Sequence, residues 1–470
     1  MEKLELVLID LQSEKITDTA YNDTTYIDKE ITKNGMVVSG DIVFVDGWQF
    51  EIDRSVPKIE TSLGKGEKEE TIGINITSTV TSDYVKANVV IEIIYEKEIE
   101  KIIINGEEIA NIGEPEKQNG KNIYRIEKEE MNNTTYTVIA KDKEEKYNIA
   151  SIKITDITED MDIWNKQDME EFRDKVNSGR TFEGRTARLM DNIDLEGSEE
   201  SQWVAIGTEE TSFKGIFEGN YHTIDNLYIK SNQQRNQALF AKTGNSNTII
   251  KNLVMKNVYV YNNWDYCHGE GDGPIAGGIV ADGNFTIYNC GIESGEITAI
   301  KPTFCSSYIS YAKAGGIVGR MFGNVTPGKI YNCYNKANIT AKGDTRIVSK
   351  FDTGLAGGIC ALDGPVIMEN CYNFGKITAQ GHGGYVGGIS NTLHDGGIIR
   401  NCYNIGEISF IGTSSGRGEI TAAPHAETIQ SNNYTTNVTK EGLGNENWLD
   451  DVENINKGYP ILKWQLNLNK

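Results

Sequence analysis

The second half of the chain repeats a short pattern of residues at unequal intervals, and this repetition constrains the fold more than any other feature. The pattern is Gly-Gly-Ile, a loop, Ile-x-Asn-Cys-Tyr, a short turn and Gly-x-Ile-Thr-Ala. Its first part appears as AGGIV, AGGIVG, AGGIC and VGGIS, starting at Ala276, Ala314, Ala356 and Val386. Because the strand segments recur while the loops vary in length, the repeats predict coils of three short strands stacked about 4.8 Å apart, a parallel β-helix.

Each copy carries a marker asparagine between two apolar positions. The marker residues are Asn226, Asn252, Asn289, Asn332, Asn370 and Asn401. If both neighbours point into the core, the chain must bend at the marker, and asparagine tolerates the left-handed conformation of such a bend. On stacked coils these amides are expected to hydrogen-bond one to the next as a ladder, which we favour over a catalytic role.

Four of the seven cysteines follow a marker directly, and they are Cys290, Cys333, Cys371 and Cys402. Such a row could hold a metal or act in redox chemistry. In the two earlier copies, however, the same position is Leu227 or Leu253, and a free cysteine behaves as a small buried apolar residue. We therefore expect the four thiols to pack in the core, and we assign no metal site.

Two further cysteines lie in loops, nine residues before the alanines that begin two of the Gly-Gly-Ile segments. Cys267 precedes Ala276, and Cys305 precedes Ala314. Equivalent loop positions on adjacent coils should be neighbours, and the spacing of coils suits the Cα separation of a disulfide. A bond between the two is an open alternative in an oxidising compartment.

One loop, NNWDYCHGEGDG at positions 262–273, has the residue mixture of a ligand site. Its candidate binding residues are Trp264, Asp265, Tyr266, His268, Glu270 and Asp272. An aromatic platform beside oxygen ligands could stack a sugar or bind Ca²⁺. The alternative interpretation, which we favour, is a solvated corner insertion rich in turn-forming residues.

Motifs of common enzymes are absent from the chain: HExxH, GxSxG, GxxxxGK[ST], CxxC and the EF-hand loop do not occur, and histidines number only 5. We assign no catalytic residue. Carboxylates alone can still serve as acid and base, as in glycosidases and β-helical polysaccharide lyases. The formal charge of −22 argues against nucleic acid or an anionic membrane surface as a partner.

The residue patterns divide the mainly β chain into five segments. Residues 1–63 combine an amphipathic helix at 2–14 with a β-hairpin or meander, and residues 71–157 alternate like an immunoglobulin-like sandwich without its cysteine pair and tryptophan. Residues 158–211 supply a helix with Asn165 as N-cap, which caps the stack, and opening strands. The repeats span 212–440, and a closing segment spans 441–470.

The repeat region resembles bacterial surface proteins that carry the GLUG motif, seen here at residues 238–241 as ALFA. TFEGRTARLMDNIDL, WVAIG and FKGIFEGNYHTIDNLYI resemble the opening of such arrays, and WLDDVENINKGYPILKWQ resembles their closing strand, so that the likeness covers residues 164–465. It implies a β-helical stalk or ligand-presenting module on adhesins of Gram-positive bacteria. It implies no catalytic residue, because the zinc motif of the metallopeptidase that accompanies some arrays is missing.

The first 59 residues, with KLELVLIDLQSEKITDT and SGDIVFVDGWQFEID, resemble the soluble part of pilin-like Firmicutes surface proteins. That resemblance implies an apolar membrane helix before residue 1. The leading hypothesis is thus a non-enzymatic, extracellular adhesin that presents loops to a carbohydrate or a host surface protein. The alternatives are a carbohydrate-active enzyme, either a polysaccharide lyase or a hydrolase, and a purely structural filament subunit.

Overall fold

The computed structural model describes residues 67–265, 273–301, 310–322, 326–343, 352–381, 383–412, 416–424, 428–444 and 446–469, with four short strands nearer the N-terminus. The chain is mainly β and separates into two compact units. Unit 1 comprises residues 1–81 and 86–157, and unit 2 comprises residues 82–85 and 158–470. The two units are described separately below.

The first part of unit 1 is a four-stranded antiparallel sheet in sequence order. Its strands are β1 (Ile31–Lys33), β2 (Met36–Ser39), β3 (Ile42–Val45) and β4 (Trp48–Glu51). The last three form a meander in the segment where a hairpin or meander is expected. The helix expected at residues 2–14 lies outside the described residues, and the pilin-like resemblance stays a prediction.

The rest of unit 1 consists of two sheets around one apolar core. One sheet contains, in spatial order, β10 (Glu116–Gln118), β11 (Lys121–Glu130), β7 (Ala87–Tyr95) and β6 (Gly73–Val80). The other contains β5 (Glu67–Lys68), β13 (Lys146–Ile154), β12 (Thr134–Asp142), β8 (Ile99–Ile104) and β9 (Glu107–Glu108).

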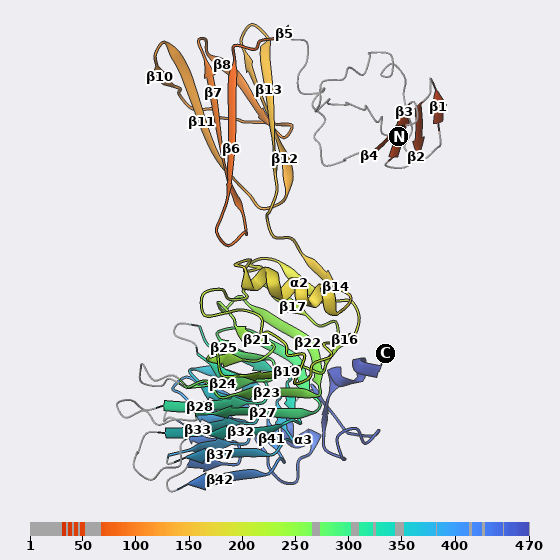
Figure 1. Ribbon diagram of the computed structural model, residues 1–470, viewed down its shortest axis with the longest axis vertical. Helices are drawn as coiled ribbons and strands as arrows, with labels where there is room; N and C mark the ends of the chain where they lie inside the picture. Colours follow the sequence, from red (N-terminus) through yellow and green to blue (C-terminus); the bar gives the residue numbers. More distant parts are fainter. Residues whose placement is uncertain are drawn as a thin grey trace. The chain divides into compact units, whose positions relative to one another are not determined.

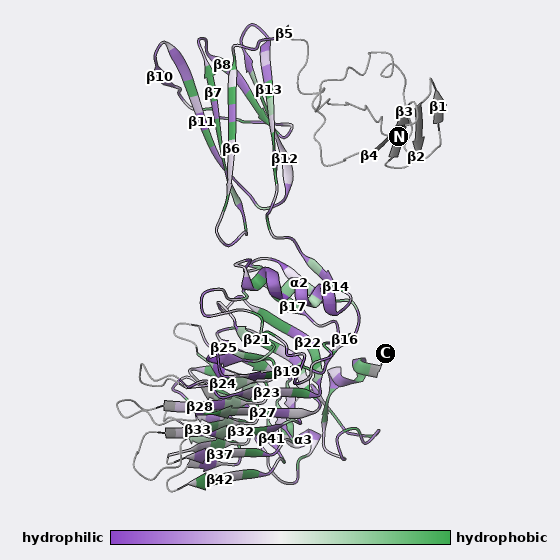
Figure 2. Cartoon of the chain, in the orientation of Figure 1, coloured by the Kyte–Doolittle hydropathy of each residue, from purple (hydrophilic) through white to green (hydrophobic). Residues whose placement is uncertain are grey.

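Alternation along the strands builds the core of unit 1. In β7 every second residue is buried. Figure 2 shows hydrophobic and hydrophilic residues following one another along β6 and its neighbours. Ile91 and Ile93 of β7 pack with Ile102 of β8 and Val138 of β12. The pairing is antiparallel except for β5, which runs parallel to β13. An immunoglobulin-like relationship stays a prediction.

Near the start of unit 2, helix α2 (Lys166–Asn177) lies at the first end of a stack of strands (Figure 1). The Asn165 side chain caps it by accepting a hydrogen bond from the Asp168 amide at 3.0 Å. Phe172 on its buried face meets the rings of Phe182 and Phe213 at centroid distances of 5.0 and 5.5 Å. The helix therefore closes the apolar interior at this end.

The remainder of unit 2 forms long parallel sheets, consistent with a parallel β-helix (Figure 1). Sheet 1 contains β14 (Met161–Ile163), β15 (Thr186–Leu189), β17 (Ile216–Glu218), β22 (Ile249–Lys256), β26 (Thr286–Ile292), β30 (Gly328–Tyr331), β35 (Val366–Glu369), β40 (Ile398–Arg400) and β45 (Ile429–Ser431). Beside it run β16 (Ile193–Asp194), β18 (Thr223–Asp225), β31 (Tyr334–Asn335), β36 (Tyr372–Asn373) and β41 (Tyr403–Asn404).

Three more parallel sheets complete the coils. Sheet 2 contains β19 (Tyr228–Ser231), β23 (Val258–Asn262), β27 (Gly295–Ile300), β32 (Asn338–Lys342), β37 (Ile377–Gly381) and β42 (Ile408–Gly412). Sheet 3 contains β20 (Asn236–Gln237), β24 (Ile275–Gly277), β28 (Ser310–Gly315), β33 (Asp352–Gly357), β38 (Tyr385–Gly387) and β43 (Gly416–Gly418). Sheet 4 contains β21 (Phe240–Lys242), β25 (Val280–Gly283), β29 (Val318–Met321), β34 (Cys360–Asp363), β39 (Ser390–Leu393) and β44 (Thr421–Pro424).

The expectation of three strands per coil is wrong, because the Gly-Gly-Ile segment is a corner that separates sheet 3 from sheet 4. A Cβ on Gly315 would lie 1.9 Å from the Val318 carbonyl oxygen of the same corner. A Cβ on Gly316 would lie 2.1 Å from the Gly358 carbonyl oxygen of the next coil. The chain turns so tightly, and the coils lie so close, that neither position has room for a side chain.

The C-terminal segment packs on the side of the stack. It contains α3 (Lys440–Leu443), the antiparallel strands β46 (Trp448–Leu449) and β47 (Ile461–Leu462), and the 3₁₀ helix η2 (Lys463–Asn469). It covers a stack of three buried tyrosines, Tyr334, Tyr372 and Tyr403, whose rings are 5.1 and 5.0 Å apart. None of the helices in the described ranges is both long and apolar enough to cross a membrane.

We predict that Gly316→Ala destabilises unit 2 by about 1–3 kcal/mol, because the new methyl group would meet the Gly358 carbonyl oxygen of the next coil. Urea unfolding followed by circular dichroism measures the change. Gly383→Ala is the matched control, since its Cβ would meet only Thr353 Oγ1, at 3.5 Å. Equal stability of the two variants would contradict the close approach at the corner.

Candidate functional site

The marker asparagines lie above one another along sheet 1 and adopt φ values between 53° and 57°. Amide donates to amide along the stack, from Asn289 to Asn252 at 2.9 Å, from Asn332 to Asn289 at 3.0 Å and from Asn370 to Asn332 at 2.9 Å. The row continues from Asn401 to Asn370 at 3.4 Å and from Asn432 to Asn401 at 3.1 Å. These hydrogen bonds join successive coils. Because the side-chain amides bind one another, we assign the row a structural role and no catalytic one.

The two ends of this asparagine ladder depart from the expectation. Asn226 has the same backbone conformation, with φ of 57°, but its amide donates to Asp194 Oδ1 at 2.8 Å and not to a marker. Asn432, which the sequence patterns did not single out, extends the ladder through the degraded copy TIQSNNY. The first asparagine of that copy, which aligns with the markers, is the signal that could have revealed it.

A second row of asparagines, which the sequence analysis missed, lies buried three residues after the markers. Asn335 donates to Asn373 Oδ1 and Asn373 donates to Asn404 Oδ1, both at 2.8 Å. Each amide also donates to the backbone two residues ahead, as Asn335 does to the Ala337 carbonyl at 2.9 Å. The last Asn of the repeated NCYN motif is the signal that could have revealed the row.

The four cysteines that follow markers are fully buried in the core. Each thiol donates to the carbonyl two residues before it, as Cys333 does to Tyr331 at 3.1 Å. Burial raises the pKa of the Cys333, Cys371 and Cys402 thiols well above the usual value, so the thiolate that a metal or a redox reaction needs is disfavoured. Within the described ranges, no group of three or more His, Cys, Asp or Glu side chains could hold a metal ion.

We predict that the five buried thiols do not react in the native protein. In a Cys267→Ser/Cys305→Ser variant the remaining cysteines are Cys290, Cys333, Cys360, Cys371 and Cys402, all buried. A thiol reagent such as Ellman's should label none of them in native buffer and all five in denaturant. Rapid labelling of the native variant would contradict the core assignment.

The loop at 262–273 is described only in its first part and at its final glycine. Trp264 and Asp265 are described, while Tyr266, His268, Glu270, Asp272 and Cys267 lie outside the described residues, as does Cys305. Asp265 pairs with the ammonium group of Lys301, a residue only 1% exposed. This carboxylate therefore neutralises a buried cation, which makes it a poor ligand for Ca²⁺.

Trp264 lines a cavity of about 470 Å³. The other lining residues come from the two preceding coils: Thr208, Glu209, Glu210, Gln233, Gln234, Arg235, Asn236 and Ala241. An indole ring beside carboxylates, amides and a guanidinium combines a stacking surface with hydrogen-bonding groups. We call this hollow the Trp264 cavity.

A buried asparagine binds the backbone on both sides of the cavity wall and at Trp264. Asn262, fully buried, donates to the carbonyls of Arg235 at 2.7 Å and Ile275 at 2.9 Å, and its Oδ1 accepts from the Trp264 amide at 3.1 Å. The start of the loop is thus tied to the strands that form the cavity wall. This attachment fixes the backbone at Trp264.

One residue in the wall of the Trp264 cavity contains a buried acceptor without a partner. Asn236 is 4% exposed and donates to Glu209 Oε1 at 2.7 Å, while its Oδ1 has no hydrogen-bond partner among the described residues. A buried carbonyl oxygen without a partner costs free energy unless a ligand or water supplies a donor.

Sheet 4 contains a row of charged side chains from three successive coils, which the sequence patterns did not predict. Asp282, fully buried, accepts two hydrogen bonds from Arg320, at 2.6 and 2.7 Å, and one from Lys242 at 2.5 Å. Burial alone would raise the pKa of Asp282, but the hydrogen bonds and positive charges of Arg320 and Lys242 hold it below its usual value. One carboxylate between two cations is a structural clamp, not an acid and base pair.

We predict that Asp282→Asn destabilises unit 2 by about 2–4 kcal/mol at pH 7, because two cations lose their shared carboxylate. A carboxyl group with a lowered folded pKa stabilises the fold above its unfolded pKa of about 4, and this contribution is lost as the pH falls through the folded value. Urea unfolding at pH 7 and pH 3 should show the gap between wild type and variant shrink in acid. The exposed Glu296→Gln serves as control, and a gap independent of pH would contradict the assignment.

Comparisons with known proteins do not show a family for this chain. No protein-family model matches it, and no curated protein matches it significantly. A solved structure described as "IgA1 Protease" aligns with 82% of this chain at 15% sequence identity and a TM-score of 0.34. This chain spans 28% of that one, and a likeness at this TM-score carries no inference about activity. The resemblance to GLUG-motif proteins stays a prediction.

Proposed function

We propose that unit 2 is a non-enzymatic binding module of a bacterial cell-surface protein and that it binds carbohydrate in the Trp264 cavity. The observation that carries the proposal is that Trp264 lines one cavity together with the amide of Asn236, the carboxylate of Glu209 and the guanidinium of Arg235. Indole rings pack against the C–H faces of sugars, and amide and carboxylate groups bind their hydroxyls. The stacked coils would supply the stiff support that such a site needs.

The location and the remaining parts belong to the same proposal. An extracellular, cell-surface position rests on the resemblance of the repeats to GLUG-type arrays and of the first residues to pilin-like Firmicutes proteins. The two-sheet part of unit 1 would then be an immunoglobulin-like spacer between the surface and the binding module. A host surface protein is the other class of partner, recognised through its glycans in this scheme.

We predict that Trp264→Ala lowers binding to the preferred glycan at least about tenfold, because the stacking surface is removed. A glycan array finds the ligand, and titration calorimetry measures the affinity of each variant. Trp164→Ala, which removes an indole that is 56% exposed and outside the cavity, is the matched control. Glycan binding that is equal in both variants would reject the Trp264 cavity as the site.

A carbohydrate-active enzyme is the second candidate, because the same cavity contains Glu209, Glu210 and Arg235. Two carboxylates and a cation could serve as acid, base and charge stabiliser for a bound polysaccharide. Both carboxylates, however, already interact with the chain's own groups: Glu209 with Asn236, and Glu210 with the Thr208 hydroxyl. Release of new reducing ends or unsaturated sugars from a bound glycan, abolished by Glu209→Gln, would favour the enzyme.

A further inference from the structure

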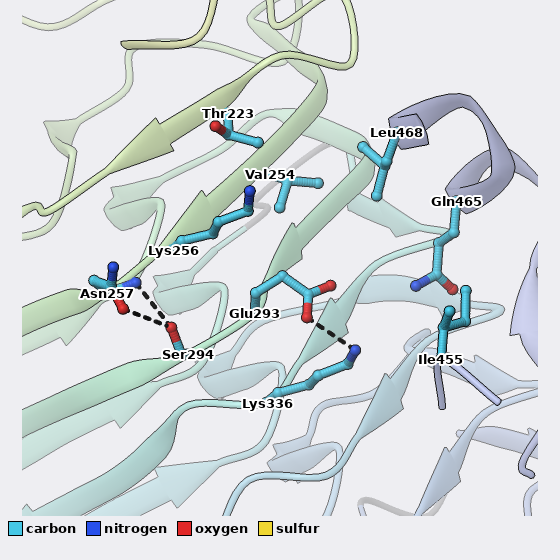
Figure 3. A pocket seen from close by; sticks show the side chains of 10 residues that line it. All are labelled: Thr223, Val254, Lys256, Asn257, Glu293, Ser294, Lys336, Ile455, Gln465 and Leu468. Atoms are coloured by element: carbon cyan, nitrogen blue, oxygen red, sulfur yellow. Dashed lines mark hydrogen bonds and ion pairs between the residues drawn. The ribbon is translucent and has the colours of Figure 1, made fainter. Parts of the chain in front are cut away.

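A second cavity, of about 430 Å³, lies between the stack and the C-terminal segment. Figure 3 shows the side chains that line it: Thr223, Val254, Lys256, Asn257, Glu293, Ser294, Lys336, Ile455, Gln465 and Leu468. It shares no lining residue with the Trp264 cavity. Its size is that of a pocket for a small molecule.

The charged groups of this cavity come from one corner of three successive coils. Lys256 ends β22, Glu293 follows β26 and Lys336 follows β31, in each case just before the chain enters sheet 2. The register pairs Met255 with Ile292 and Ile292 with Asn335. Lys256, Glu293 and Lys336 therefore form a Lys-Glu-Lys row along the stack.

Glu293 is already neutralised within this row. Its Oε2 lies 2.9 Å from Lys336 Nζ, and its Oε1 accepts a hydrogen bond from the buried Tyr334 hydroxyl at 2.5 Å. Figure 3 shows the carboxylate turned toward Lys336. The Tyr334 phenol and the Lys336 ammonium group together fix the carboxylate, so it does not pair with Lys256.

Lys256 is the cation that remains. Its side chain extends into the hollow (Figure 3), and it forms no ion pair or hydrogen bond with any described residue. Asp225, its partner in the sheet, forms no ion pair with it either. Lys256, Lys336 and Glu293 are the charged residues of the lining, which gives it a formal charge of about +1 on a chain whose formal charge is −22. The Asp225 carboxylate lies outside the lining and accepts from the Thr223 hydroxyl at 3.3 Å.

The rest of the lining suits a polar ligand with a carbon skeleton. Val254, Ile455 and Leu468 are apolar, and the amide of Gln465 and the hydroxyls of Thr223 and Ser294 are polar. The Gln465 side chain is held by Tyr372, whose hydroxyl accepts from Gln465 Nε2 at 2.9 Å. An acidic sugar would match such walls, with its ring against the apolar side and its carboxylate on Lys256.

We propose that this cavity binds a small carboxylate-bearing molecule of the size of an acidic monosaccharide, with Lys256 as the carboxylate partner. The proposal is independent of the Trp264 cavity. Glucuronate, galacturonate and N-acetylneuraminate are the probes, and glucose is the neutral comparison. Their binding to the full chain is measured by titration calorimetry at low and high salt.

At least one acidic sugar should bind, more weakly at high salt, while glucose should not bind the Trp264→Ala variant, in which the other cavity has lost its indole. Lys256→Gln should weaken this binding at least about tenfold, whereas Lys329→Gln, outside the cavity, and Trp264→Ala should leave it unchanged. Glu293→Gln should bind at least as tightly, since it removes a negative charge and releases Lys336. Circular dichroism checks that each variant is folded.

The proposal is overturned if none of the three acidic sugars binds at millimolar concentration, or if glucose binds the Trp264→Ala variant equally well. It is also overturned if Lys256→Gln binds like wild type. Loss of acidic-sugar binding in Trp264→Ala would place the ligand in the other cavity and reject this one. Loss of binding in Glu293→Gln would contradict recognition of an anion by the lysines.

Discussion

The backbone hydrogen bonds between successive parallel strands are the constraint on which unit 2 depends. They place each residue directly over its counterpart in the next coil, as Ile297, Ile339 and Ile377 show in sheet 2. A residue type that recurs in the sequence therefore becomes a row in space. Apolar rows fill the interior, and polar rows must find partners along the same direction.

The two asparagine ladders solve the polar part of this problem. A buried primary amide has two donors and an acceptor to satisfy, and a neighbour of the same kind one coil away supplies the complementary groups. Asn373 is an example, because its amide accepts from Asn335 and donates to Asn404 and to the Gly375 carbonyl. Each such residue depends on its neighbours, so the coils support one another.

The mainly β character and the parallel sheets of the repeat region could be predicted from sequence, because apolar positions around Cys290, Cys333 and Cys371 recur while loops change length. The number of strands per coil could not. Gly-Gly-Ile looks like a turn in sequence, and only the close approach of backbones at Gly315 and Gly316 makes it a corner between two sheets.

The candidate sites were harder to predict than the sheets. The choice of Trp264 followed from composition, but its neighbours Glu209 and Arg235 belong to earlier segments that carry no motif. Their proximity depends on how the coils stack, which a linear pattern does not state. The second cavity, which contains Lys256, was missed for the same reason, since its wall includes Gln465 from the far end of the chain.

The C-terminal segment that covers the three stacked tyrosines is synthesised last, which affects folding during translation. Tyr334, Tyr372 and Tyr403 belong to coils that are synthesised well before Trp448, Trp464 and Gln465, the residues that seal them. Until those residues leave the ribosome, three aromatic rings on the outside of newly formed coils face water or a chaperone. The coils can assemble in order during translation, but their outer surface becomes native only when the closing segment arrives.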